Sequence, residues 1–132
     1  MKKQGSPAEW DSARRLTARL VHDVAKYVAR TARNIGAEPL APDLVAMLCR
    51  DLFALPRGRA SLVFEELARP LEDLVGQDPA LARAREHLAR IDALEVAVRQ
   101  GEPAALARAV AAALAVEESV RTFARELQER TP

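Results

Sequence analysis

Hydrophobic residues recur along the chain every three or four positions, which is the spacing of one face of an α-helix. Five stretches show this spacing, at about residues 7–35, 42–55, 60–75, 79–99 and 103–129. In the first stretch, Leu16, Leu20 and Val24 fall on one stripe. No segment alternates with a period of two, so we expect no β-strands. The pattern predicts an all-α protein.

Proline and glycine mark the ends of the predicted helices. A proline stands where four of them begin, at positions 7, 42, 79 and 103, and proline suits the first helical position. Ser6 followed by Glu9 has the pattern of a capping box, and Asp78 is a second good N-cap. Pro70 lies inside the third helix and is expected to kink or split it. Glycine favours the left-handed C-cap and follows three helices, at Gly36, Gly76 and Gly101.

The connections between the predicted helices are short, so consecutive helices should be antiparallel neighbours. We therefore expect an up-and-down bundle of four to five antiparallel helices. We expect one domain over residues 1–132, with residues 1–6 flexible, because no linker divides the chain.

Composition narrows the class of protein. Hydrophobic residues make up 49% of the 132 residues, and 27 of them are alanine, so the core is expected to consist of aliphatic residues and close helix contacts. The net charge of +1 gives no general attraction to nucleic acid or membranes. No apolar run reaches the roughly 20 residues that span a bilayer. Cys49 is alone, which fits a cytoplasmic protein, and 17 Arg against 3 Lys suggests a bacterial source.

Most enzymatic motifs are missing from the sequence. No glycine-rich phosphate loop and no Gly-x-Ser-x-Gly nucleophile elbow is present. His22 and His87 are the two histidines, and neither has the Glu three residues earlier that di-iron bundles use. The few aromatic residues offer no stacking platform for nucleic acid. We therefore expect no metal and no other cofactor, and we favour a protein that is not an enzyme.

The last predicted helix has two turns without any polar side chain, at residues 109–116. A helix that is apolar all round is buried all round. One interpretation is that this helix is the central one of the bundle. The other is that its outer face is the seam of a homodimer.

His22 is the strongest chemical clue. At about 100° per residue, it lies nearly opposite the apolar stripe of the first helix and so faces outward. Asp23 follows directly, and small and basic side chains surround the histidine. The outward face that we expect a protein partner to bind consists of Arg15, Ala18, Arg19, Ala25, Ala29 and Arg33. Nearby cations would stabilise a phosphoryl group on the imidazole.

The stretch Leu20-Val21-His22-Asp23-Val24-Ala25-Lys26-Tyr27-Val28 resembles the phosphoacceptor box of histidine kinase dimerisation helices, where an acidic residue follows the histidine. It is also distantly similar to histidine phosphotransfer domains. By this resemblance, His22 would accept a phosphoryl group and pass it to a receiver domain. Asp23 would be its acid–base partner, and Lys26 would stabilise the charge. The kinase boxes carry Asn or Thr where this chain has Lys26.

Two functional hypotheses follow. The first is a helical-bundle protein-interaction module in bacterial signalling or regulation, which acts by binding other proteins. The alternative is a phosphorelay module in which His22 is the phosphoacceptor, together with Asp23 and Lys26.

Overall fold

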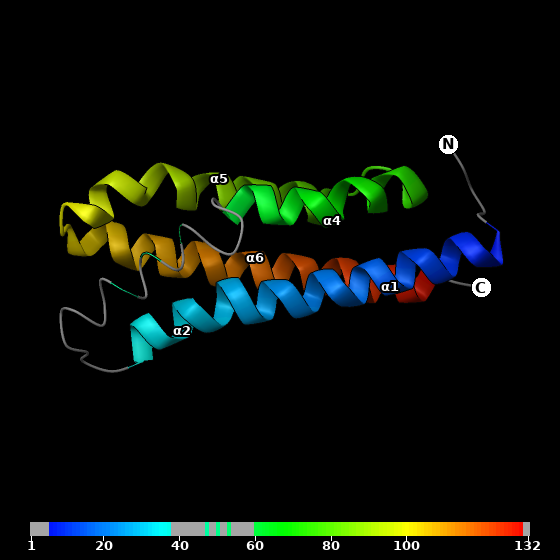
Figure 1. Cartoon of the computed structure of the whole chain (residues 1–132), viewed down its shortest axis with the longest axis horizontal. Coiled ribbons are helices and arrows are strands. Elements are labelled where there is room, and N and C mark those ends of the chain that lie inside the picture. The colour runs from blue at the N-terminus through cyan, green and yellow to red at the C-terminus, as the bar shows by residue number, and fades with distance from the viewer. Residues whose placement is uncertain (1–5, 38–46, 48–49, 51–52, 54–59, 131–132) are drawn as a thin grey trace.

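The computed structural model describes residues 6–37, 47, 50, 53 and 60–130. The helical elements in these ranges are α1 (Pro7–Asp23), the π-helix η1 (Val24–Ala29), α2 (Arg30–Ala37), α4 (Ala60–Val75), α5 (Pro79–Arg99) and α6 (Pro103–Arg130). The first three form one continuous rod. Figure 1 shows that this rod, α4, α5 and α6 alternate in direction along the long axis. The protein is therefore an all-α, up-and-down bundle, as the hydrophobic pattern predicts.

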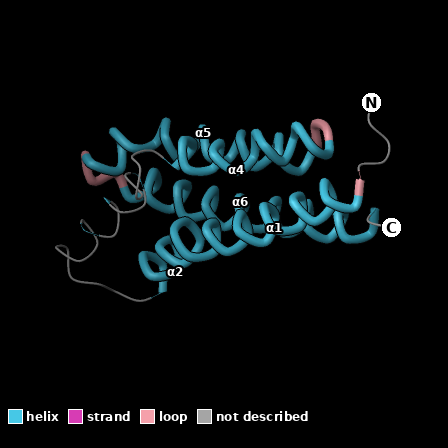
Figure 2. The backbone as a smooth tube through the Cα atoms, turned by 45° about the vertical axis from the view of Figure 1, so that its right-hand side comes forward, coloured by secondary structure: helices cyan, strands magenta, loops and turns pink. Residues whose placement is uncertain are grey.

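The helix bounds agree closely with those expected from the sequence. The bounds of α4 and α5 are those predicted, and α6 ends one residue later than expected, at Arg130. Figure 2 shows short loops between α4 and α5 and between α5 and α6. The predicted helix at 42–55 lies outside the described residues except for Met47, Arg50 and Phe53, which are helical.

Local capping determines where several helices begin and end. Glu9 N–H donates to Ser6 Oγ at 3.2 Å, and Ser6 N–H donates to Glu9 Oε1 at 2.8 Å, which is the predicted capping box. Of the segment expected to be flexible, only Ser6 lies within the described residues, and it is held by this cap. Gly76 and Gly101 follow α4 and α5 with φ of 86° and 83°, where glycine avoids the strain of other residues.

One prediction about a helix end is wrong. Gly36 is expected to stop the first helix, but α2 continues through it to Ala37. Of the kink or split expected at Pro70, the split does not occur, because α4 runs unbroken from Ala60 to Val75 with the proline inside it. The helix tolerates Pro70 because neighbouring residues hold it in the bundle: Leu67, Ala68 and Leu71 are all buried.

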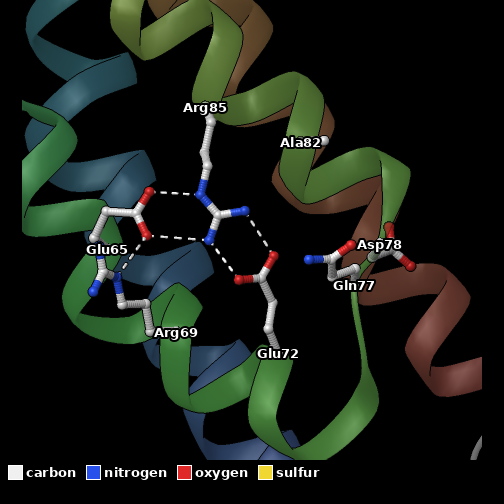
Figure 3. Close-up of a pocket in the computed structure, with 7 residues that line it drawn as sticks. All are labelled: Glu65, Arg69, Glu72, Gln77, Asp78, Ala82 and Arg85. Carbon is white, nitrogen blue, oxygen red and sulfur yellow. Dashed lines mark hydrogen bonds and ion pairs between the residues drawn. The ribbon is translucent and has the colours of Figure 1, made fainter. Parts of the chain in front are cut away.

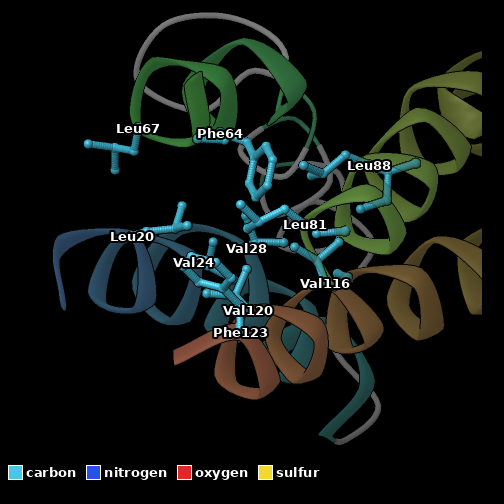
Figure 4. Close-up of a cluster of buried hydrophobic side chains, with 14 of the residues drawn as sticks. Leu20, Val24, Val28, Phe64, Leu67, Leu81, Leu88, Val116, Val120 and Phe123 are labelled. Carbon is cyan, nitrogen blue, oxygen red and sulfur yellow. The ribbon is translucent and has the colours of Figure 1, made fainter. Parts of the chain in front are cut away.

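The core consists of aliphatic side chains with phenylalanines between them. Figure 4 shows Leu20, Val24, Phe64, Leu81 and Phe123 pointing into the space between the helices. Phe123 is the largest of the completely buried side chains among the described residues. Because these residues come from α1, η1, α4, α5 and α6, the described elements share a single core.

The π-helix changes which side chains of the first rod face inward. In a regular α-helix, at about 100° per residue, Ala29 would lie on the side opposite Leu20. A π-helical turn contains an additional residue, so the residues after it are turned back by about 100°. Ala29 and Ala32 are consequently 0% exposed. The core-facing stripe of α1 is thus shifted to a different set of sequence positions in α2.

The last helix is not enclosed on all sides. α6 packs against α5 on one side and against α1, η1 and α2 on the other. Within its apolar turns, Ala109 and Val116 are buried, but Ala111 and Leu114 are exposed. The expectation that this helix is buried on all sides is therefore wrong. Its apolar outer face is open among the described residues.

Candidate functional site

The imidazole of His22 lies on an exposed face of α1, one residue before the end of that helix. Its side chain is 68% exposed. Leu20 and Val24, two residues before and after it, are buried in the core. The core therefore fixes the backbone at this point while the ring projects into solvent. The predicted outward orientation is confirmed, whereas the role of His22 stays a prediction.

Asp23 orients the ring. Its Oδ1 lies 3.2 Å from His22 Nδ1, and its side chain is only 21% exposed. In the tautomer with the proton on Nδ1, this N–H donates to the carboxylate, and Nε2 carries the free lone pair. The arrangement leaves Nε2 as the nitrogen available to a nucleophilic or proton-transfer reaction.

The two cations near His22, Arg19 and Lys26, make different contacts. Arg19 is 69% exposed, and its Nε lies 3.9 Å from Asp23 Oδ2. The Nζ of Lys26 lies 5.2 Å from the centroid of the Tyr27 ring, in a cation–π contact. The role expected of Lys26 beside the imidazole stays a prediction. Arg19 is a cation beside the Asp23 carboxylate of the His22–Asp23 pair.

The remaining residues of the predicted partner-binding face separate into two groups. Arg15 and Ala18 are exposed and Ala25 is half-buried, so they surround His22 on an accessible surface. The inclusion of Ala29 is wrong, because this residue is completely buried. The π-helix is the reason, since it turns the chain beyond Asp23 toward the core.

Arg33 also departs from the prediction. Its guanidinium donates to the carboxylate of Glu117 on α6, although the Arg33 side chain is still 57% exposed. Glu117 is nearly buried and also accepts a hydrogen bond from Arg121 at 3.2 Å. Arg33 thus ties α2 to α6 and is not part of the surface around His22. The accessible part of the face is Arg15, Ala18, Arg19, His22 and Ala25.

A comparison with known protein families, curated proteins and solved structures found no match to this chain. The candidate site is therefore defined by the chain's own chemistry.

A second polar cluster lies between α4 and α5, and the sequence analysis does not identify it. Arg85 of α5 donates from Nε to Glu65 Oε2 at 2.5 Å and from Nη2 to Glu72 Oε1 at 2.6 Å (Figure 3). These residues line a pocket of about 400 Å³, together with Arg69, Gln77, Asp78 and Ala82. The guanidinium also lies 5.8 Å from the Phe64 ring centroid.

The electrostatics of this cluster are those of a structural ion pair. The hydrogen bonds that Arg85 donates to Glu72, and then those it donates to Glu65, raise the pKa of Arg85 above its ordinary value, against the opposing effect of burial. Arg85 therefore keeps its charge, and both carboxylates use their oxygens to bind it. The sequence contained a signal for this ion-pair cluster. Glu65 and Glu72 are seven residues apart, which places them on one face of their helix, and Arg85 lies on the antiparallel helix after the next turn.

Neither metal coordination nor a membrane-spanning helix is found among the described residues. No group of three or more His, Cys, Asp or Glu side chains in ranges 6–37 and 60–130 could hold a metal ion. Within the same part of the chain, no helix is both long and apolar enough to cross a bilayer. Cys49 lies outside the described residues.

Proposed function

We propose that this protein is a helical-bundle interaction module of a cytoplasmic signalling or regulatory system, and that a protein partner binds the exposed face of α1 around His22. The observation that carries this proposal is the exposure of the histidine side chain, 68%, on a helix whose opposite face is locked in the core. The small side chain of Ala18, one turn earlier, leaves room for a partner to approach the ring.

A photo-crosslinking amino acid placed at Ala18 tests the docking face. In cells that produce the protein, we expect the probe at position 18 to give a discrete adduct with one partner. The matched control carries the probe at Ala93, which is exposed on α5. Once the partner is purified, Ala18→Trp should weaken its binding, and Ala93→Trp should not. Equal adducts from both positions, or an adduct from the control alone, would contradict the proposal.

A second candidate function, phosphotransfer, is favoured by the hydrogen bond between His22 and Asp23. In this reaction, Nε2 of His22 attacks the phosphorus of an acyl phosphate on a receiver domain's aspartate. The N–P bond forms as the acyl O–P bond breaks, and the aspartate carboxylate leaves. The proton on Nδ1 stays hydrogen-bonded to Asp23, so no further proton has to move. Arg19, whose Nε lies 3.9 Å from Asp23 Oδ2, is a cation that would stabilise the new negative charge.

The two histidines provide a matched test of phosphotransfer. With phosphoramidate, a small phosphoryl donor, we expect one acid-labile, alkali-stable phosphate on the chain. His22→Gln should abolish this label, and His87→Gln should retain it. Asp23→Asn should slow labelling by at least about tenfold, because the amide no longer holds the reactive tautomer. A label that persists in the His22→Gln variant would exclude the reaction while leaving the docking face untouched.

A further inference from the structure

The outer face of α6 is an apolar surface with no partner among the described residues. We define it by four exposed side chains spaced three or four residues apart, Ala104, Ala107, Ala111 and Leu114. Leu114 is 36% exposed, one of only a few large hydrophobic side chains left accessible in the described part of the chain. The small alanines beside it would allow another helix backbone to approach closely.

Two opposite charges flank the α6 outer face. Arg108 and Glu118 are both exposed, and neither forms an ion pair with another described residue. The neighbouring charges of α6 differ in this respect, since Arg121 pairs with Glu117 and Arg130 with Asp78. Arg108 and Glu118 are ten residues apart, which is about 15 Å along the helix.

We propose that this face binds a second copy of the chain, with the two α6 helices antiparallel and their two-fold axis between Ala111 and Leu114. In this register, Ala107 of one copy lies opposite Glu118 of the other. Arg108, the next residue after Ala107, then contacts this Glu118. The two-fold axis repeats the contact, so the dimer has two Arg108–Glu118 contacts. A parallel arrangement would place Arg108 against Arg108 and Glu118 against Glu118. The charge pattern therefore selects the antiparallel orientation.

The size of the face limits the strength of this dimer. Stable complexes commonly bury about 800 Å² on each partner, which exceeds what one face of a single helix pair provides. We therefore expect a dissociation constant on the order of tens of micromolar or weaker. The dimer should consequently exchange with monomer in a concentration-dependent way.

A charge-reversal cycle tests both the dimer and its orientation. Sedimentation equilibrium of the wild-type chain should show a mass that rises from monomer to dimer with concentration. Arg108→Glu and Glu118→Arg should each raise the dissociation constant on the order of tenfold, because each places like charges together twice. The double variant R108E/E118R should restore the wild-type constant. Since both positions are exposed, each variant should keep the helical circular-dichroism spectrum of the wild type.

Three results would overturn this proposal. A monomer mass at every concentration up to about 1 mM would exclude the dimer. Association that neither single reversal weakens would place the interface elsewhere. A double variant no better than the single ones would reject the antiparallel pairing. None of these results concerns the face around His22.

Discussion

Several single residues link charges on neighbouring helices. Arg85 is the clearest case, because one guanidinium on α5 satisfies two carboxylates on α4. Its side chain is 31% exposed, and those of Glu65 and Glu72 are 26% and 18% exposed. Removal of Arg85 would therefore leave two half-buried negative charges side by side.

At this scale we predict that Arg85→Ala lowers the free energy of unfolding by about 1–3 kcal/mol, as measured by urea denaturation. The control is Arg83→Ala, an exposed neighbour on α5, which should change it by less than about 0.5 kcal/mol. Because the pKa of Arg85 is raised in the folded state, its contribution is fully present below the ordinary pKa of arginine and is lost as the pH rises from there through the raised pKa. The difference between Arg85→Ala and wild type should thus be the same at about pH 7 and about pH 9. Equal stability of the two alanine variants would show that the cluster is not stabilising.

The π-helix is the feature that matters most at the scale of elements. The additional residue in η1 separates two regular α-helices that both face the core, but through different sequence positions. Deletion of one residue from η1 should convert it to a regular turn and keep both flanking faces directed inward. Deletion of one residue from α1 should instead rotate part of the rod by about 100° and move polar residues into the core.

We therefore predict that a chain lacking Lys26, which is exposed in η1, still folds cooperatively with a melting temperature within about 10 °C of wild type. A chain lacking Ala18, which is exposed in α1, should lose most of its stability. Thermal melts followed by circular dichroism compare the two. If the Lys26 deletion were the more damaging, the proposed change of helical phase would be wrong.

Much of the element structure could be predicted from the sequence because its signals are local. Ser6, Asp78 and the two left-handed glycines act within a few residues of their helix ends, and their placements agree with the structure. The outward orientation of His22 followed from the phase of the same helix. The phase beyond Asp23 could not be predicted, because the sequence between Val24 and Ala29 has no marker of a π-helical turn, and so Ala29 and Arg33 were misplaced.

At the scale of the whole molecule, stability depends on the shared core. Phe123 is completely buried among side chains from several helices, as Figure 4 shows. Helical periodicity alone could not predict which residues would meet in this core. It also could not predict which side of α6 would be left uncovered. Both depend on how the described helices pack together and not on any one of them.

We predict that Phe123→Ala lowers the free energy of unfolding by about 3–5 kcal/mol and the melting temperature by more than about 10 °C, because it leaves a cavity where helices meet. Val96→Ala serves as the control. Val96 is 66% exposed, so its truncation should cost less than about 0.5 kcal/mol. Differential scanning calorimetry measures both. A Phe123→Ala variant as stable as Val96→Ala would contradict the observed packing.

The described rods alternate in direction, and this has a practical consequence. Because the beginning of α1 and the end of α6 lie at the same end of the bundle, the molecule can be grafted into a surface loop of a host protein without stretching either junction (Figure 1). A fluorescent protein interrupted in this way would carry the whole bundle as one lobe. A change in the bundle would then reach the chromophore through both junctions at once, so the fluorescence would report whether the bundle is folded.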